Sequence, residues 1–337
     1  METRIQDEQN YEYVEDLPPI EDVGNSGGKN DMPDKEQKQA EKRKKQMAKK
    51  RFKDRRDGRY LRSIDALQKL TPYIMPNRND ALIAFTSTIE MTKADKYCRE
   101  KVKSGKSYFT ILHLILSAYV RTIAEHPEIN RFVSGRRIYA RRRIEVNMIV
   151  KKEMIAQGAE TGIKVIFDPH DTVDQVYDRF NSVVREVVDN PNSATDMDKL
   201  NVLLLHMPRC LLRMAIASLR FLDFHGWIPR SALDVSPFHG SLIITSMGSL
   251  GIPPVYHHIY NFGNLPLFIS YGIKQTIPTI NKDGETVPKK IIELKIVLDE
   301  RICGGYHFAS AFKTLKKYLE HPELLDSPPE KVVDDIY

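Results

Sequence analysis

Apolar residues recur at two different periods along the chain from about Arg59 onward, and these periods predict its secondary structure. Ile144, Val146, Met148 and Val150 alternate with polar residues, which predicts a half-buried strand. Strands are predicted in this way at residues 80–90, 144–150, 162–168, 242–246, 267–271 and 291–298. Residues 131–143 are predicted to form a short hairpin, with Ser134 and Gly135 at its turn.

Helical spacing dominates the segments between these strands. Thr172 and Gln175 form a capping-box pair ahead of apolar residues at helical spacing, which predicts a helix from residue 172 to about 189. Further helices are predicted at residues 92–104, where Thr92 is the expected cap, and at 108–126, 196–206, 209–224 and 306–319. Strands and helices interleaved in this order predict an α/β fold, with a mixed sheet covered by helices.

The first 57 residues carry many charges and no apolar periodicity, so they are predicted to form a tail outside the core. Residues 1–34 hold ten acidic and two basic side chains and are predicted to be disordered. Residues 35–57 hold twelve basic and four acidic ones, which makes them a candidate nucleic-acid-binding arm, with a solvated linker as the alternative. The domain is expected at residues 58–325, followed by a C-terminal tail at 326–337.

Composition narrows the functional classes. The chain has 337 residues, 41% of them hydrophobic, which allows a sizeable core without disulfides or a structural metal. Cys98, Cys210 and Cys303 are odd in number and far apart, so no zinc-ligand spacing is present and a cytoplasmic protein is expected. The N-terminus does not have the pattern of a secretory signal. The longest apolar run, residues 108–120, is too short to span a bilayer, so no membrane contact is expected. No metal site is expected either, because no metal-ligand spacing is present.

A short motif lies between the last predicted strand and the last predicted helix. Residues 299–305 are Asp-Glu-Arg-Ile-Cys-Gly-Gly, which resembles the Asp-His-Arg-x-x-Asp-Gly signature of dihydrolipoamide acyltransferases, the core subunits of 2-oxoacid dehydrogenase complexes. The segment is also similar to the His-x-x-x-Asp-Gly-Phe-His segment of chloramphenicol acetyltransferases. Blocks of the same family are matched, in order, by residues 89–92, 127–130, 243–252, 265–272 and 277–287, so the likeness covers roughly residues 60–322.

The resemblance implies a homotrimer of the chloramphenicol acetyltransferase-like fold that transfers an acyl group between coenzyme A and a thiol or hydroxyl acceptor, in a channel between subunits. In the family a histidine deprotonates the acceptor, and a hydroxyl of the facing subunit stabilises the oxyanion. The hydroxyl position is Thr245 here and the histidine position is Glu300. Gly304 stands at the second aspartate position, so the ion pair that would hold the loop is expected to be missing. Because a glutamate has an ordinary pKa of about 4.3, an acidic thiol is the favoured acceptor.

Three further histidines are candidates for channel or substrate contacts. His307 lies seven residues after Glu300, and His257 and His258 lie in the loop that borders the channel by resemblance. The alternatives are a structural histidine for His307 and an exposed loop surface for the other two. Cys303 occupies an apolar position of the motif and has no paired base, which predicts a buried structural thiol.

Arginines crowd the predicted hairpin. Arg136, Arg137 and Arg141 are candidates for contacts to the phosphates of coenzyme A, with nucleic acid or a solvated face as the alternatives. Residues 58–337 contain 37 basic and 31 acidic side chains, whereas the two halves of the tail cancel each other. An anionic acyl carrier is therefore the favoured partner of the domain.

The two changes in the motif leave two functions open. With Glu300 as an altered base, the chain is predicted to be an acyltransferase that uses a coenzyme A thioester as co-substrate and holds no resident cofactor. With the changes at Glu300 and Gly304 taken as losses, it is predicted to be a non-catalytic trimer that binds an acylated ligand or scaffolds a partner. The first 57 residues are too poor in apolar residues for a lipoyl-type module, so a stand-alone protein is expected.

Overall fold

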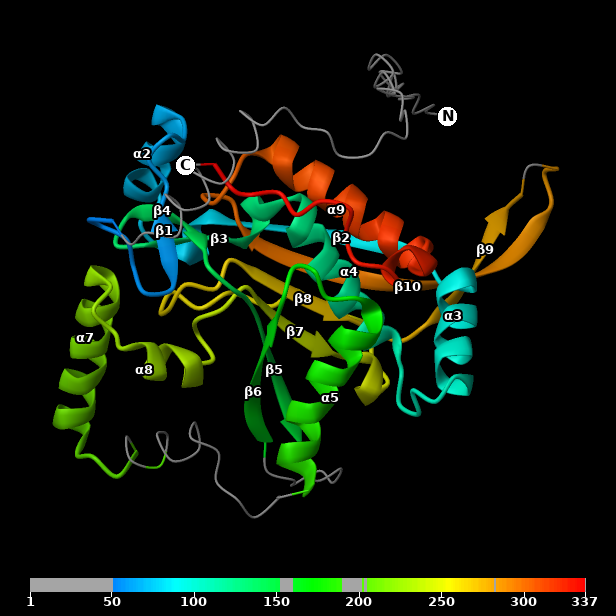
Figure 1. Ribbon diagram of the computed structural model, residues 1–337, viewed down its shortest axis with the longest axis horizontal. Coiled ribbons are helices and arrows are strands. Elements are labelled where there is room, and N and C mark those ends of the chain that lie inside the picture. The colour runs from blue at the N-terminus through cyan, green and yellow to red at the C-terminus, as the bar shows by residue number, and fades with distance from the viewer. Residues whose placement is uncertain (1–50, 152–159, 190–201, 203–204, 282, 337) are drawn as a thin grey trace, which may run out of the picture. The chain divides into compact units, whose positions relative to one another are not determined.

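The computed structural model describes residues 51–151, 160–189, 202, 205–281 and 283–336 (Figure 1). Its helices are α2 (Ala66–Ile74), α3 (Thr92–Lys103), α4 (Ile111–Glu125), α5 (Val173–Asp189), α7 (Arg209–His225), α8 (Arg230–Val235) and α9 (Gly305–Glu320). Short 3-10 helices are η1 (Arg78–Ala81), η2 (Pro127–Asn130), η3 (Gly248–Leu250) and η4 (Pro322–Leu325). Its strands are β1 (Gly58–Tyr60), β2 (Leu82–Glu90), β3 (Arg131–Ser134), β4 (Arg137–Arg141), β5 (Ile144–Lys151), β6 (Glu160–Phe167), β7 (Leu242–Ser246), β8 (Leu267–Tyr271), β9 (Gln275–Ile280) and β10 (Thr286–Asp299).

Seven strands form one mixed sheet. Six of them follow the order β2-β10-β8-β7-β5-β6, and β9 pairs with the N-terminal part of β10. β7 runs parallel to β5 and β8, and the other neighbours are antiparallel. A second sheet has the order β1-β4-β3. The predicted α/β fold, with a mixed sheet covered by helices, is confirmed.

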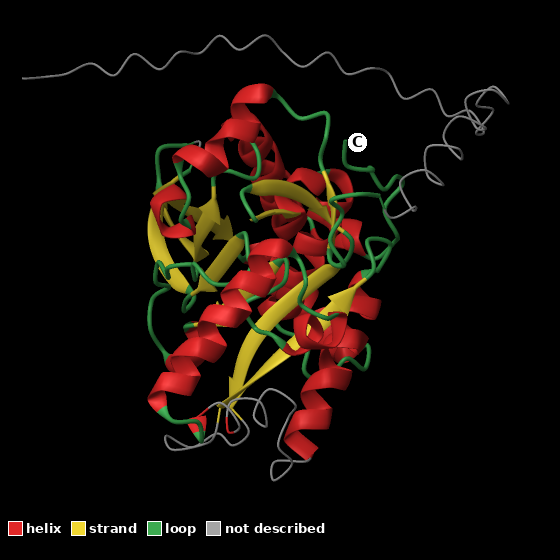
Figure 2. Cartoon of the chain, turned by 90° about the vertical axis from the view of Figure 1, so that its left-hand side faces the viewer, coloured by secondary structure: helices red, strands yellow, loops and turns green. Residues whose placement is uncertain are grey.

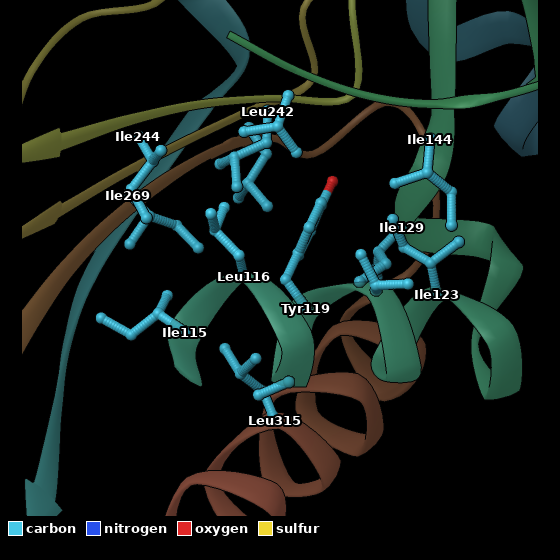
Figure 3. Packing of buried hydrophobic residues seen from close by; sticks show 14 of the residues in the cluster. Ile115, Leu116, Tyr119, Ile123, Ile129, Ile144, Leu242, Ile244, Ile269 and Leu315 are labelled. Carbon is cyan, nitrogen blue, oxygen red and sulfur yellow. The ribbon is translucent and has the colours of Figure 1, made fainter. Parts of the chain in front are cut away.

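One face of the large sheet is buried beneath α4, α5 and α9. Alternate strand residues such as Ile244 and Ile269 point toward Ile115 of α4 (Figure 3). Tyr119 of α4 is fully buried in the same layer, and its hydroxyl donates to the Ser241 carbonyl at 3.1 Å. α4 is apolar on nearly all sides because it lies between the sheet and α9. This helical layer fixes the strands that carry the candidate site.

The opposite face of the sheet has a much smaller cover. Phe268 of β8 and Val297 of β10 pack there against Ile259 and Leu265, which belong to the long loop between η3 and β8. This loop, residues 251–266, crosses a face on which other side chains stay accessible. The candidate site residues of β7 and of the loop belong to this thinly covered side.

Helix starts show where local capping rules hold. The capping box before α5 is confirmed, since the Thr172 N–H donates to Gln175 Oε1 at 2.8 Å and the Gln175 N–H to Thr172 Oγ1 at 3.5 Å. The predicted cap at Thr92 is wrong, because Thr92 is already the first residue of α3 and Met91 occupies the N-cap. α4 begins later than predicted, at Ile111, because the side chains of Thr110 and His113 form a capping box there.

Short or locally unusual elements were the ones that periodicity did not predict. β1 and α8 are too short for a period to be measured, and α2 contains a proline, Pro72. The hairpin turn is also shifted by one residue, since Ser134 pairs with Arg137 and the turn is made by Gly135 and Arg136. Both turn residues have positive φ, 56° and 58°, as a two-residue turn requires. The helix predicted at residues 196–206 falls almost wholly outside the described residues.

Residues on both sides of the predicted domain contact it. Before it, Arg55 pairs with Asp57 at 3.0 Å and with Asp223 of α7 at 2.8 Å, in buried surroundings. After it, Asp335 accepts from Arg131 at 2.9 and 2.5 Å. The boundaries predicted at residues 57/58 and 325/326 stay predictions, and these contacts are the features that would set them. None of the described helices combines the length and the apolar character needed to cross a membrane.

The buried histidine of α4 makes stability depend on pH. His113 is 4% exposed, lies among aromatic rings and accepts from the Thr110 N–H at 3.0 Å, and its burial lowers its pKa to about 4. With an ordinary pKa of about 6.5 in the unfolded chain, the stabilising effect of neutral His113 is complete above that value and is lost as the pH falls toward 4. We expect the free energy of unfolding to fall by roughly 2 kcal/mol from this group between pH 7.5 and 5. Urea unfolding of the native chain and of His113→Phe across this pH range tests the prediction. The variant should be less stable at pH 7.5, but its free energy of unfolding should fall less steeply with pH, because it lacks the contribution of His113. Equal slopes would contradict the assignment.

Candidate functional site

The motif segment forms the turn from β10 into α9, and one buried carboxylate holds it. Asp299, fully buried, accepts from Arg301 Nε and Nη2 at 2.7 Å each, and from Arg78 Nε at 3.3 Å. Arg301 also donates to the Met75 carbonyl at 2.8 Å, and Arg78 to the Gly263 carbonyl at 2.9 Å. The turn is therefore tied to the end of α2 and to the loop over the thinly covered face. The ion pair of the family's second aspartate is not possible at Gly304, and the first aspartate of the motif, Asp299, holds the turn instead.

Glu300 follows this anchor directly. Its backbone N–H donates to the Ala81 carbonyl at 2.9 Å, which continues the pairing of β10 with the β2 side of the sheet. Its side chain is half-buried and makes no hydrogen bond or ion pair with any residue that the structure describes. On the far side of the turn, Gln68 of α2 donates to the Ile302 carbonyl at 2.9 Å. The backbone of Glu300 is therefore fixed on both sides of the turn, while its carboxylate is unengaged by the described part of the chain.

Gly304 occupies the N-cap of α9. Its backbone is extended, with φ −75° and ψ 163°, and a Cβ built on it would meet no other atom within 4 Å. An aspartate fits this position, because N-cap residues have this backbone conformation and their side chains accept from the first N–H groups of the helix.

We therefore expect Gly304→Asp to raise the free energy of unfolding by about 0.5 kcal/mol, because the aspartate side chain would cap the first turn of α9. Thermal unfolding measures it, with Gly305→Ala as a control for losing a glycine in the same turn. A clear loss of stability in Gly304→Asp would contradict the assignment of residue 304 as a cap position that accepts an aspartate.

Thr245 is half-buried in β7 and lies far from Glu300 within one chain. The register pairs Thr245 with Ser270 of β8, and Ser270 with Lys295 of β10. Glu300 comes five residues after Lys295, which corresponds to about 17 Å along a strand. The structure therefore does not bring the two predicted catalytic residues together in a single subunit.

His257 lies on the same face of the sheet as Thr245. Its ring stacks on Phe268 with centroids 4.5 Å apart and 10° between planes, and Phe268 pairs with Ile243, two residues before Thr245. His258 stacks on His257 and is exposed. Of the two loop histidines, His257 is therefore the one that the structure places against the sheet near Thr245.

His307 stands apart from these two. It is exposed in the first turn of α9, with its Nδ1 3.8 Å from Glu128 Oε1. Cys303 of the same motif is buried, and its burial raises the pKa of the thiol. The predicted burial of the Cys303 thiol is confirmed, and His307 is exposed at the surface.

A polar group on this face, made by Lys295, Thr86 and Tyr256, was not predicted from the sequence. Lys295 Nζ donates to Thr86 Oγ1 at 2.6 Å and lies 4.9 Å from the centre of the Tyr256 ring, whose hydroxyl is 2.7 Å from Thr86 Oγ1. Lys295 alternates with inward-facing Leu294 and Ile296, so its outward direction could have been inferred from the period of β10. It adds a positive charge to the strand residue aligned with Thr245 and Ser270.

The three predicted arginines separate into two kinds. Arg136 and Arg137 lie at the hairpin tip and line two cavities at the surface. Arg141 is buried, donates through Nη2 to both the Asn264 carbonyl and its Oδ1 at 2.9 and 3.0 Å, and lies over the Phe132 ring. A ligand arriving from solvent can meet the first two arginines, whereas Arg141 stabilises the interior.

Among the residues that the structure describes, no group of three or more His, Cys, Asp or Glu side chains could hold a metal ion.

The site thus consists of a mixed sheet, a turn held in place before the last helix and a half-buried carboxylate, and a family model matches the segment that contains it. Residues 233–326 match the family of 2-oxoacid dehydrogenases acyltransferase (catalytic domain). The matched segment contains β7 with Thr245 and the motif with Glu300. The resemblance predicted from the motif is thus confirmed over this part of the chain.

Solved structures were also compared with the chain. A probable dihydrolipoamide acetyltransferase from Listeria monocytogenes 4b F2365 has 14% identity and a TM-score of 0.49, with 78% of this chain and 95% of that chain covered. The cubic core of a pyruvate dehydrogenase multienzyme complex has 14% identity and a TM-score of 0.45, covering 77% and 88%. A chloramphenicol acetyltransferase has 13% identity and a TM-score of 0.45, covering 77% and 99%. A comparison with curated proteins found no match.

Proposed function

We propose that the protein transfers an acyl group between coenzyme A and a thiol or other small acceptor, with Glu300 as the base. The observation that carries this proposal is the family motif itself, held in place by Asp299 while the Glu300 side chain stays unengaged. A cytoplasmic location belongs to the proposal and is in keeping with three free cysteines.

The reaction follows from the chemistry of a carboxylate. Glu300 takes the proton of an acceptor S–H, and the resulting thiolate attacks the thioester carbonyl. The oxyanion of the tetrahedral intermediate accepts a hydrogen bond from the Thr245 hydroxyl. The intermediate collapses as the C–S bond to coenzyme A breaks, and the departing thiolate recovers the proton from Glu300. An acceptor thiol of low pKa suits this base, because little driving force is needed to ionise it.

A second copy of the chain is part of the proposal. Thr245 and Glu300 lie about 17 Å apart along the strand direction in one subunit, so one active site needs each residue from a different subunit. A homotrimer supplies three such sites by symmetry. The thin cover over the Thr245 face is the feature that favours this face as the one a neighbour occupies.

The remaining predicted contacts are assigned by position. Arg136 and Arg137 are the proposed contacts to phosphates of coenzyme A, and the buried position of Arg141 excludes it from that role. His257 is the proposed channel residue, because it lies on the Thr245 face. His258 and His307 are exposed and would contact only the mouth of a channel.

The alternative is a non-catalytic trimer that binds an acylated ligand or scaffolds a partner. It is favoured by the two changes in the motif, since Glu300 and Gly304 stand at the positions of the family's histidine and second aspartate. Nucleic-acid binding by the basic arm is a separate possibility of the sequence that concerns residues 35–57, most of which lie outside the described range.

Release of coenzyme A from acetyl, propionyl and branched acyl donors, with dithiol, monothiol and alcohol acceptors, tests the proposal. We expect turnover with thiols to exceed turnover with alcohols, because only the thiols ionise readily. Coenzyme A release no faster than with the Glu300→Ala variant would contradict catalysis. Saturable thioester binding without release would establish the alternative.

A further inference from the structure

Two surface cavities adjoin at the tip of the β3–β4 hairpin. The first, the arginine cavity, has a volume of about 440 Å³ and is lined by Arg78, Arg136, Arg220 and Arg301. The second, the tryptophan cavity, has a volume of about 560 Å³ and is lined by Phe52, Lys53, Arg56, Arg137 and Trp227. Gly135 and Phe224 line both, so a single ligand can extend from one cavity into the other. Figure 2 views this end of the unit face on.

Unpaired positive charge is the first property of this double cavity. Lys53, Arg56, Arg136, Arg137 and Arg220 form no ion pair with any residue that the structure describes. The carboxylates that line the cavities are already paired, as the next contacts show. Five cations without counterions thus surround a space large enough for a small molecule, which favours an anionic ligand.

The two lining carboxylates are held by other arginines. Asp54 pairs with Arg62 and Arg142 at 3.6 Å each, and Asp223 pairs with Arg55 at 2.8 Å. Neither is available to neutralise the cations at the cavity mouths. An anion that enters therefore meets cations that have no carboxylate partner among the described residues.

Exposed aromatic surface is the second property. Trp227 is 58% exposed, and its ring stacks on His225 with centroids 4.9 Å apart and 29° between planes. Phe52 is 88% exposed and Phe224 is 50% exposed at the same cavity. A flat aromatic ring stacked beside Trp227 would cover this surface, and stacking of a base on an aromatic side chain is insensitive to the kind of base.

We propose that the double cavity binds a nucleotide, with its base beside Trp227 and its phosphates between Arg137 and Arg136. Trp227 and Arg137 line one cavity and Arg136 lines the adjoining one, which is the order of groups in a nucleoside diphosphate. The nucleotide portion of coenzyme A and a separate nucleotide share this chemistry. The site requires no acyl transfer, so inactivity of the protein as an acyltransferase would leave the inference standing.

Trp227 is the only tryptophan in the chain, so its fluorescence reports on the cavity directly. The full-length protein is titrated with adenosine 5′-diphosphate, coenzyme A, adenosine and a single-stranded oligonucleotide. We expect the diphosphate to quench Trp227 saturably and adenosine to bind at least tenfold more weakly. Competition between coenzyme A and the diphosphate would show that the site takes the nucleotide portion of coenzyme A, and its absence that it takes a separate nucleotide.

Arg137→Gln should weaken diphosphate binding at least tenfold, measured both by fluorescence and by calorimetry. Arg213→Gln is the matched control, because Arg213 is exposed on α7 and lines neither cavity, and it should change the Kd less than twofold. No saturable signal from either phosphorylated ligand at millimolar concentration would overturn the inference. Binding of adenosine as tight as that of the diphosphate, or binding of the oligonucleotide alone, would overturn it as well.

Discussion

Replacing Asp299 by asparagine is expected to lower the free energy of unfolding by about 3 to 5 kcal/mol, the cost of removing one partner from a buried ion pair. Asp299 is fully buried and is the carboxylate that faces both Arg78 and Arg301, whose side chains are 4% and 2% exposed. In the variant two guanidinium groups would keep their charge in the interior without a counterion. Urea unfolding of the native chain and of Asp299→Asn measures the loss.

A surface pair provides the control for this prediction. Asp178 is exposed and bonds Lys106 at 2.8 Å, so Asp178→Asn should cost less than about 1 kcal/mol. If Asp299→Asn cost no more than Asp178→Asn, the turn before α9 would not depend on its buried carboxylate, and the positioning of Glu300 would need another explanation.

Replacing Glu300 by glutamine is expected to reduce thiol acylation by a factor of about 10² to 10⁴, the usual contribution of a general base. Glutamine keeps the shape and the half-buried position of the side chain but cannot accept a proton at neutral pH. Since the Glu300 side chain bonds no described residue, the substitution should leave the unfolding curve unchanged. Initial rates of coenzyme A release measure the effect of the substitution on the chemical step, and the Kd of the thioester, measured separately, gives its effect on binding.

Glu330→Gln is the matched control for this experiment, since Glu330 is exposed near the C-terminus and should leave the rate unchanged. A histidine at position 300 should extend activity to alcohol acceptors, because a neutral imidazole is a stronger base than a carboxylate. Equal rates for the native chain and for Glu300→Gln would remove Glu300 from the mechanism.

The larger part of the fold followed from periodicity in the sequence. Long elements with a clear period, such as α5 and β10, were predicted within a few residues, because each buries one face or one stripe. α2 and the shifted hairpin turn at Gly135 and Arg136 were missed, since they depend on local backbone geometry and on contacts with distant segments.

The candidate site was predictable only where a motif carried it. Glu300 and Thr245 were predicted from the family resemblance. The role of Asp299 as the anchor of the turn could not be predicted, because it depends on Arg78, which lies 221 residues away in the chain. The double cavity at Trp227 was equally hidden. Its lining comes from the segment before β1, the hairpin and the end of α7, which only the folded chain brings together.

We propose that each active site combines Glu300 of one subunit with Thr245 of another, and mixed trimers are the test of this arrangement. Glu300→Gln and Thr245→Ala chains are each expected to be nearly inactive, the second because loss of an oxyanion donor costs about 10² to 10³ in rate. Coexpressed in equal amounts, they should regain about one quarter of the native activity, because one site in four then receives both intact residues from neighbouring subunits. Activity of the mixture no higher than that of the separate variants would contradict a shared site.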